Sequence, residues 1–306
     1  MLQWVKFWFL GLIWGSSFML IKVSVEDLGP FVLVSIRLSL AAALFFMFLH
    51  LTGRRLPTDP KLLLPLTFVG VFNTAVPFVL ISTGETMIDS SVATVFNATV
   101  PLFNLVIAHF VLADERLNTA KIVGLIVGFM GVVLLVSRGL STTDNPVLGQ
   151  ILVMLGALCY AVSLVVIRSR LRSVDRYTIA GWSLVIGAIA IVSATLLVAR
   201  PFPPVEDVSR NAILAAITLA VVNTAGAYFL FYELLENWGV RASLITYALP
   251  PIGVTLGVLV LDEPLTWQLV AGGVLIMAGI ITTKADTPRY ITNLLPIHLR
   301  PRPRIR

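Results

Sequence analysis

The sequence has very few charged residues. Asp, Glu, Lys and Arg make up 12% of the 306 residues, whereas hydrophobic residues make up 58% and the mean hydropathy is +0.94. A soluble domain carries about 25% charged residues. Because a chain of this composition cannot present its outer surface to water, we predict a protein embedded in a membrane.

Cysteine and histidine are also scarce. The single cysteine, Cys159, excludes a disulfide framework within the chain. The three histidines, His50, His109 and His298, are scattered without the spacing of zinc ligands. We therefore expect neither a metal site nor a cofactor.

Long apolar runs occupy most of the chain. Ten of them approach the length of about 20 residues that a helix needs to cross a bilayer, and each is bounded by charge or proline. They predict an all-α polytopic membrane protein with ten transmembrane helices. The predicted helices lie near Val5–Val23, Phe31–Leu51, Leu62–Ser82, Ala93–Leu112, Ala120–Ser137, Val147–Ile167, Thr178–Ala199, Ala212–Tyr232, Ala242–Leu261 and Gln268–Thr283.

The sequence also contains an internal repeat, which divides the chain into a first unit (1–139), a second unit (140–286) and a basic tail (287–306). Five helices per unit is an odd number, so the second unit must enter the membrane from the opposite side. Two inverted repeats around one central site are the geometry that alternating access requires. Matching positions lie 146 to 150 residues apart: Trp14 with Tyr160, Ser17 with Ser163, Asn73-Thr74-Ala75 with Asn223-Thr224-Ala225, Pro101 with Pro251, Glu115 with Glu263, Gly124 with Gly272, and Gly131 with Gly279.

The positive charges predict the orientation. If the amino terminus is cytoplasmic, most of the 22 lysines and arginines fall on inner segments and in the tail. We therefore predict a multi-pass protein of the plasma (inner) membrane with both termini in the cytoplasm. The formal net charge of +6 then matches the anionic inner leaflet and not a nucleic acid, because the basic residues lie at the ends of spans and in the tail.

Several of these residues carry a resemblance to a known family. The segment Trp14-Gly15-Ser16-Ser17-Phe18, which continues to Lys22, resembles the opening of the ten-helix drug/metabolite transporter superfamily in its EamA-type branch. A repeated pattern of proline, glutamate and glycine also resembles the same branch. The first copy of the pattern is Pro101, Glu115-Arg116-Leu117, Gly124 and Gly131, and the second copy is Pro251, Glu263-Pro264-Leu265, Gly272 and Gly279. The resemblance covers Trp4 to Lys284. It implies two EamA domains and a secondary transporter that exports small metabolites such as amino acids or drug-like solutes. Pro264 stands where the first copy has Arg116, so the two helix ends are expected to differ.

The candidate solute-binding residues are polar or aromatic side chains within the predicted spans. Amides and hydroxyls at this depth are costly unless they are hydrogen bonded, and aromatic walls with a few polar groups suit a small amphipathic solute. Helix packing and interhelical hydrogen bonds are the alternative explanation for each. The candidates are Trp14, Ser17, Phe18, Arg37, Asn73, Thr74, Asn97, Tyr160, Asn223, Thr224, Tyr228 and Tyr247.

A second set of residues has a predicted structural or gating role. Pro101, Pro250 and Pro251 interrupt helices inside the bilayer and free backbone carbonyls. Glu115 and Glu263 lie at helix ends, where a cap or a loop tether is the simplest role.

Arg37 is the most informative single candidate. It lies seven residues beyond Pro30, roughly 10 Å below the outer end of its helix. A cation inside the hydrocarbon costs about 2.5–3.5 kcal/mol on insertion scales, so it should face the bundle interior and have a partner. That partner is either a group of the protein or a carboxylate or phosphate of the solute. Within the protein it would be a helix-end carbonyl or a carboxylate, with Glu85 and Asp89 as candidates, and the contact would hold the outer gate.

Two other classes of function stay open beside the transporter. A membrane channel would be expected to show rings of charge or a filter sequence. A membrane-embedded enzyme would need a convergent nucleophile, acid/base pair or metal set. Neither pattern is visible in the sequence, so we expect a small-molecule solute as the ligand and no enzymatic activity.

Overall fold

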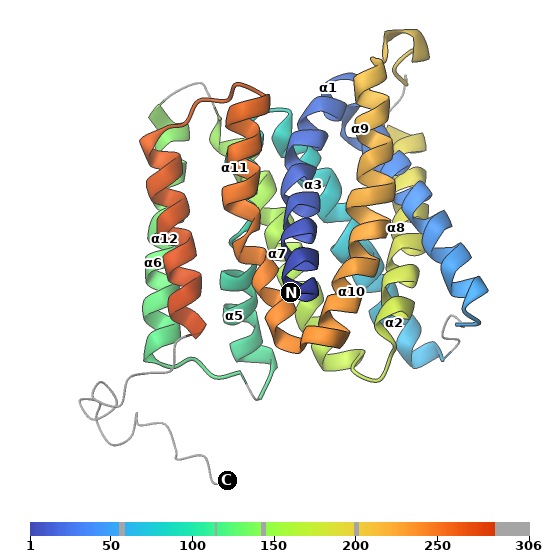
Figure 1. The fold of residues 1–306 in the computed structure, drawn as a ribbon, viewed down its shortest axis with the longest axis horizontal. Helices are drawn as coiled ribbons and strands as arrows, with labels where there is room; N and C mark the ends of the chain where they lie inside the picture. The colour runs from blue at the N-terminus through green and yellow to red at the C-terminus, as the bar shows by residue number, and fades with distance from the viewer. Residues whose placement is uncertain (55–58, 114, 142–144, 199–201, 285–306) are drawn as a thin grey trace.

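The computed structural model describes residues 1–54, 59–113, 115–141, 145–198 and 202–284. These residues form helices and no strand, as the apolar runs predicted (Figure 1). The predicted basic tail lies outside the described residues. The elements are α1 Leu2–Leu51, α2 Pro60–Gly70, η1 Val71–Ala75, α3 Val76–Glu85, α4 Ser90–Asn97, α5 Val100–Val111, α6 Thr119–Ser141, α7 Val147–Arg170, α8 Arg176–Val198, η2 Val205–Asp207, α9 Arg210–Ala220, η3 Val221–Gly226, α10 Ala227–Trp238, η4 Gly239–Tyr247, α11 Leu249–Val260 and α12 Trp267–Lys284.

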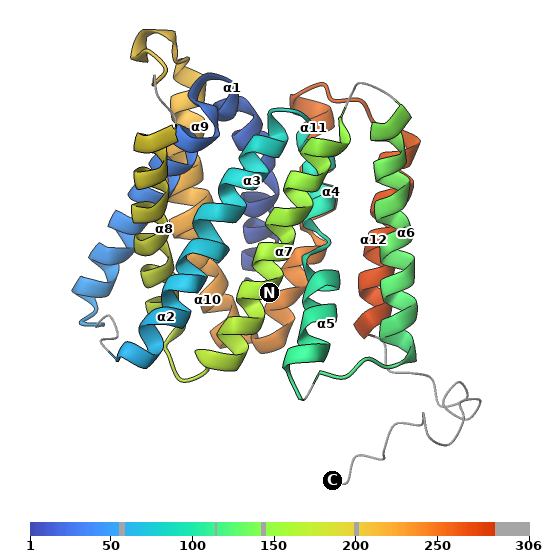
Figure 2. The ribbon, with the colours of Figure 1, turned by 180° about the vertical axis from the view of Figure 1, so that it is seen from behind.

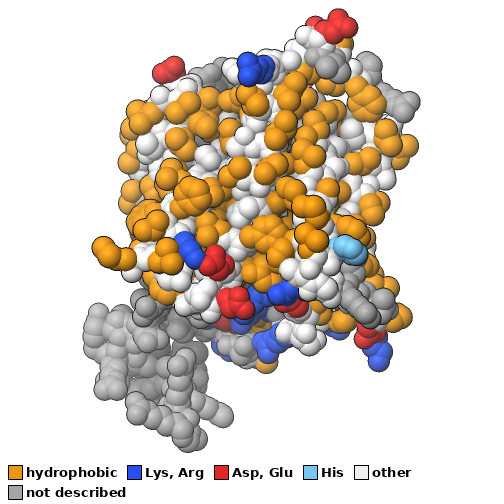
Figure 3. All heavy atoms as spheres, turned by 45° about the vertical axis from the view of Figure 1, so that its right-hand side comes forward, with side chains coloured by type: hydrophobic (Ala, Val, Ile, Leu, Met, Phe, Trp, Pro, Cys, Tyr) orange, Lys and Arg blue, Asp and Glu red, His pale blue; other side chains and the backbone are white. Residues whose placement is uncertain are grey.

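Seven of the described helices are long and apolar enough to cross a membrane, counting α2 to α3, α4 to α5 and α9 to α10 as continuous. Two further apolar helices, Leu244–Val260 and Trp267–Thr283, are shorter. The space-filling view supports a membrane location, because hydrophobic side chains cover the middle of the visible face and charges gather toward its two ends (Figure 3).

The helix α1 contains two of the predicted spans, Val5–Val23 and Phe31–Leu51. Between them Gly29 has φ 69° and ψ 160°, a conformation outside the helical region that a residue with a Cβ rarely adopts. Pro30 follows and fits the first turn of the second segment. The two segments run in opposite directions along the bundle (Figure 1). We call the end of the bundle at this turn the Gly29 end and the opposite end, where α1 begins, the N-terminal end.

The repeated Asn-Thr-Ala segments share an unexpected conformation. Asn73 lies in η1 and Asn223 in η3, and both elements are π-helical. The threonine hydroxyls donate to backbone carbonyls of the preceding turn. Thr74 donates to Gly70, and Thr224 donates to Leu219 at 2.8 Å. Such π-bulges are rare and occur frequently at functional sites. Each bulge therefore marks the same position in the two copies of the repeat.

The prolines lie where helices restart. Pro101 is in the first turn of α5, after the break that follows α4, and Pro250 and Pro251 are in the first turn of α11, after η4. Proline is tolerated there because its missing N–H has no partner within a helix at that position. A helix therefore begins at each of these proline positions.

Helices α6 and α12 pack closely at one edge of the bundle, and they lie side by side in both ribbon views (Figures 1 and 2). Glycines form the contact. A Cβ added at Gly279 would lie 2.5 Å from the backbone nitrogen of Gly128 and 2.6 Å from the carbonyl oxygen of Gly124. Small residues let helix backbones approach in this way.

We expect Gly279→Ala to lower the free energy of unfolding by about 1–3 kcal/mol, because the two backbones must move apart. Gly273→Ala on the same helix is the matched control, since its Cβ would lie 3.7 Å from Val95, an ordinary contact. Thermal unfolding of both variants in detergent measures the difference. Equal melting temperatures would show that this glycine contact does not limit stability.

Candidate functional site

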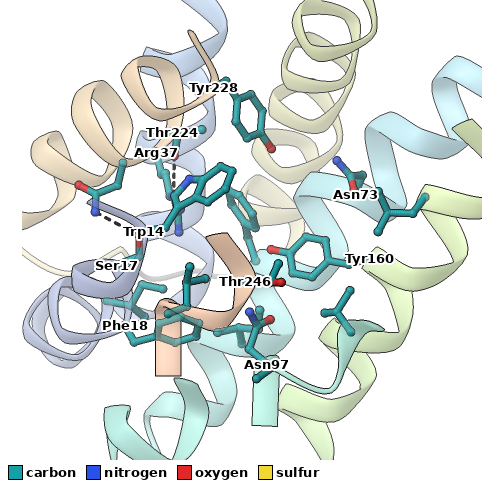
Figure 4. A pocket seen from close by; sticks show the side chains of 18 of the residues that line it. Trp14, Ser17, Phe18, Arg37, Asn73, Asn97, Tyr160, Thr224, Tyr228 and Thr246 are labelled. Atoms are coloured by element: carbon teal, nitrogen blue, oxygen red, sulfur yellow. Dashed lines mark hydrogen bonds between the residues drawn. The ribbon is translucent and has the colours of Figure 1, made fainter. Parts of the chain in front are cut away.

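A cavity of about 270 Å³ lies where α1, η1, α3, α7, η3, α10 and the starts of α5 and α11 converge. All of the predicted solute-binding residues line it except Thr74 and Tyr247 (Figure 4). Its lining consists of Trp14, Ser17, Phe18, Ile21, Arg37, Asn73, Phe78, Ile81, Asn97, Ala98, Val100, Pro101, Tyr160, Leu164, Asn223, Thr224, Tyr228, Thr246 and Leu249.

The two exceptions have clear positions. Thr74 is fully buried, and its hydroxyl donates to the carbonyls of Gly70 and, at 3.2 Å, of Ser183. It therefore links η1 to α8 and does not reach the cavity. Tyr247 does not line the cavity, whereas its neighbour Thr246 does. Thr246 could not be chosen from sequence, because a lone threonine in a helix usually bonds to its own backbone.

Arg37 contributes a buried cation to the cavity wall. Its side chain is 7% exposed, and its Nε donates to the Thr224 hydroxyl at 2.9 Å. Its guanidinium carbon lies 4.0 Å from the centre of the Phe78 ring, within range of a cation–π interaction. Phe78 could not be predicted from sequence, because nothing distinguishes it from the other phenylalanines, of which this apolar chain has 17.

The carboxylates that the sequence suggested as partners for Arg37 do not pair with it. Asp89 accepts a hydrogen bond from Asn145 Nδ2 at 2.7 Å. Glu85 is buried but forms no ion pair with Arg37. No carboxylate of the described residues lies within ion-pair distance of the guanidinium. A cation in this position suits an anionic group of a ligand.

The other polar groups of the cavity are amides and hydroxyls. Figure 4 shows the hydroxyls of Tyr160 on α7 and Tyr228 on α10 turned toward the middle of the cavity. Neither hydroxyl is hydrogen bonded to another described residue. The buried Oδ1 of Asn97 also accepts no hydrogen bond from a residue that the structure describes. The cavity therefore combines one cation with unsatisfied donors and acceptors and aromatic walls, which is the composition of a site for a small polar ligand.

The two repeated asparagines differ in their contacts. Asn223 Nδ2 donates to the carbonyl of Ile13 and lies 3.1 Å from the hydroxyls of Ser16 and Ser17. Asn73 is half-buried, and its side chain makes no hydrogen bond to another described residue. Asn223 thus ties η3 to the first segment of α1, whereas Asn73 is available to a ligand.

We expect Asn223→Ala to lower the free energy of unfolding by about 1–3 kcal/mol, because the carbonyl of Ile13 and two serines lose a buried donor. Asn73→Ala should change stability by less than about 0.5 kcal/mol and weaken solute binding. Melting temperature and solute-induced thermal shift, measured on both variants, separate the two effects. Equal loss of stability in the two variants would mean that Asn73 is also a packing residue.

The predicted glutamates lie at opposite ends of the bundle and make different contacts. Glu263 is 8% exposed, and its two oxygens accept from the backbone N–H groups of Ser90 and Ser91 at 2.7 and 2.9 Å. It therefore caps the first turn of α4 at the Gly29 end, across the boundary between the two repeats. A carboxylate is favoured at this position by the free N–H groups and the helix dipole.

Glu115 forms ion pairs at the N-terminal end, with Arg168 at 3.0 Å and Lys121 at 3.1 Å. Partial burial raises the pKa of Glu115, but the hydrogen bonds from Arg168 and Lys121 outweigh this and hold the pKa below its ordinary value. The stabilisation by this group is therefore present at neutral pH and is lost as the pH falls through the lowered pKa.

Comparison with known proteins connects this architecture to a family. The model of the EamA-like transporter family matches residues 4–137 and again residues 147–284. The chain belongs to the EamA-like transporter family. It is a multi-pass membrane transporter, and the names of its family and relatives are those of transporters.

Relatives of this EamA-like chain align over nearly its whole length. An uncharacterized transporter of Archaeoglobus fulgidus is 30% identical over 92% of this chain and 98% of the relative. A probable amino-acid metabolite efflux pump of Escherichia coli (strain K12) is 26% identical over 88% of this chain and 90% of the relative. A solved crystal structure with 20% identity has a TM-score of 0.64 and covers 92% of this chain, so it shares the fold.

Proposed function

We propose that this EamA-like chain is a secondary transporter of the plasma membrane that exports small metabolites, such as amino acids or drug-like solutes, by alternating access. The observation that supports this most directly is that matching residues of both repeats line the central cavity. Trp14 and Tyr160 are one such pair, and Phe78 and Tyr228 are another at an offset of 150. A site between two repeats is the arrangement expected of an alternating-access carrier.

The chemistry of the cavity favours an amino acid. Arg37 can bind the solute carboxylate, because a guanidinium donates two parallel N–H groups to the carboxylate oxygens. The free Oδ1 of Asn97 and the rings of Trp14 and Tyr160 suit an ammonium group, by hydrogen bonding and by cation–π interaction. The volume of about 270 Å³ suits a small solute. The name of the Escherichia coli relative is consistent with this class.

A counterflow experiment tests the proposal. Purified protein in liposomes is loaded with one unlabelled amino acid, and uptake of the labelled form is measured across a panel of amino acids. We expect uptake that saturates with concentration and is stimulated by solute on the other side. Flux that rises linearly without counterflow would indicate a channel, and chemical conversion of the solute would indicate an enzyme.

For the topology we propose ten spans with both termini in the cytoplasm. The units are 1–139 and 140–286, related as inverted repeats, and the basic tail 287–306 lies at the anionic inner leaflet. The turn at Gly29 supports this count because it divides α1 into two antiparallel segments.

Cysteine accessibility checks this orientation. After Cys159 is replaced, a cysteine at Asp207, exposed between α8 and α9, should react with a membrane-impermeant reagent added outside the cell. A cysteine at Ser173, exposed between α7 and α8, should react only after the membrane is permeabilised. The reverse pattern would place both termini outside.

A further inference from the structure

Glu85, the last residue of α3, carries a buried carboxyl group that does not line the cavity. The residue is 0% exposed. Neither of its two carboxyl oxygens has a hydrogen-bond partner among the described residues. It lies at the Gly29 end, one helical turn beyond Ile81, which lines the cavity. One turn of helix is about 5.4 Å long, so Glu85 is close to the cavity without being part of its wall.

The nearest cation does not neutralise Glu85 by direct contact. Lys22 Nζ donates to the backbone carbonyls of Glu85 at 2.8 Å and Ile88 at 3.2 Å, and it forms no ion pair with the Glu85 carboxyl group. Lys22 thus ties α1 to the connection between α3 and α4. Its hydrogen bonds to main-chain carbonyls would be made whether Glu85 is ionised or neutral.

The charged groups around Glu85 oppose one another. Lys22 and Arg37 on α1 are cations, and Glu263 on the connection between α11 and α12 is a carboxylate. Helix α7 packs on Gly84 through Gly149 and Val153 and has no charged residue before Arg168. Asp89, at the start of α4, is held by Asn145.

An ionised carboxylate without hydrogen-bond donors and away from water is costly, and taking up a proton removes that cost. The position is less suitable for a metal cation. Hard cations require several oxygen ligands, and no cluster of three His, Cys, Asp or Glu residues that could hold a metal ion occurs in the described ranges. A single carboxyl group beside Lys22 can bind a proton through one oxygen alone.

We propose that Glu85 is the proton-binding site that couples solute movement to protons. This inference rests on the proposed carrier function. The proton binds to a Glu85 oxygen from water when the Gly29 end is open, and closure of that end buries the neutral acid. When the carrier opens at the N-terminal end, water reaches Glu85 from the central cavity, one helical turn away, and takes up the proton. The contacts of Lys22 with the end of α3 and of Glu263 with the first turn of α4 are the ones that must change for the Gly29 end to open.

Infrared spectroscopy tests the proton site without any knowledge of the solute. Purified wild-type protein in lipid should show the carbonyl band of a protonated carboxylic acid near neutral pH, and the band should disappear at high pH. Glu85→Gln should lack this band, and the control Glu115→Gln, which removes an ion-paired surface carboxylate, should retain it. A wild-type spectrum with no such band at any pH from acidic to neutral, or a band that survives in Glu85→Gln, overturns the proposal.

Transport in liposomes tests the coupling. A pH gradient, imposed in each direction in turn, should drive accumulation of labelled amino acid by the wild type in one direction. Glu85→Gln should retain counterflow but accumulate at least tenfold less. Accumulation at the wild-type level, or accumulation driven by a sodium gradient at equal pH, overturns the coupling.

A third variant tests the proposal if Glu85→Gln does not fold. If Glu85→Gln is unstable, Glu85→Asp keeps a carboxyl group, and both its band and the pH dependence of accumulation should move to a different pH. An unchanged pH dependence in a folded Glu85→Asp contradicts the proposal. If the wild type moves no amino acid at all, the carrier function fails, and the infrared result still decides whether Glu85 binds a proton.

Discussion

Replacing Glu263 with alanine is expected to cause the largest loss of stability of any single change at the Gly29 end. The variant leaves the N–H groups of Ser90 and Ser91 without an acceptor inside the protein. Hydrogen bonds to a charged group contribute about 1.5–3 kcal/mol each, and a buried orphan donor has a cost of its own. We therefore expect the free energy of unfolding to fall by roughly 2–5 kcal/mol.

The pseudo-symmetric Glu115 provides a matched control. Its two ion pairs lie near the surface, with a side-chain exposure of 29% for Glu115 and 39% for Arg168. Exposed ion pairs contribute about 0–1 kcal/mol, so Glu115→Ala should shift the melting temperature far less than Glu263→Ala. Glu263→Gln should be intermediate, because its amide oxygen can still accept one hydrogen bond. Thermal unfolding in detergent ranks the three variants, and similar losses for Glu115→Ala and Glu263→Ala would argue against the cap.

The two glutamates lie beside segments of the two repeats that differ in conformation. At the Gly29 end, α4 is an α-helix capped by Glu263. Its counterpart in the second repeat, η4, is a 3₁₀ helix, and the Glu115 carboxylate accepts instead from Lys121 and Arg168. Two copies of one unit thus adopt two conformations in one structure. Under alternating access the copies would exchange these conformations, so opening the Gly29 end would release α4 from Glu263.

Much of this architecture could be predicted from the sequence, because its strongest signals are local or repeated. Apolar runs predicted the helices, and Pro101 and Pro251 predicted where two of them restart. The offsets of 146 to 150 residues singled out side chains in both copies, and seven of these line the cavity: Trp14, Ser17, Asn73, Pro101, Tyr160, Asn223 and Thr224. Duplication helped because both copies contribute to one central site.

The remaining features depend on contacts between distant segments, which no local pattern records. Glu263 caps a helix 173 residues away from it in the chain. The sequence could not show that Thr74 bonds to α8 while Thr224 faces Arg37. Nor could it show that Glu85 is buried without a partner, because a carboxylate at the end of a helix is usually solvated.

Loss of the Arg37 guanidinium is expected to cause the largest loss of solute affinity. If Arg37 holds the solute carboxylate, Arg37→Gln removes both the charge and the paired N–H donors. A charge-assisted hydrogen bond contributes about 1.5–3 kcal/mol, and each 1.4 kcal/mol is a factor of about ten in affinity. We therefore expect the half-saturation concentration to rise roughly 10- to 100-fold. Arg37→Lys keeps the charge and loses the planar fork, so its effect should be smaller.

A solute without a carboxylate separates binding from general damage to the site. The wild type should prefer an amino acid to the corresponding amino-acid amide, and Arg37→Gln should abolish that preference because the discriminating cation is gone. Thr224→Val is a second control, since it removes the acceptor of the Arg37 Nε hydrogen bond and keeps the charge in the cavity. Size-exclusion chromatography confirms that each variant is folded. An Arg37→Gln protein that folds and retains the wild-type preference would show that Arg37 serves the contact between α1, Thr224 and Phe78, and that the solute carboxylate binds elsewhere.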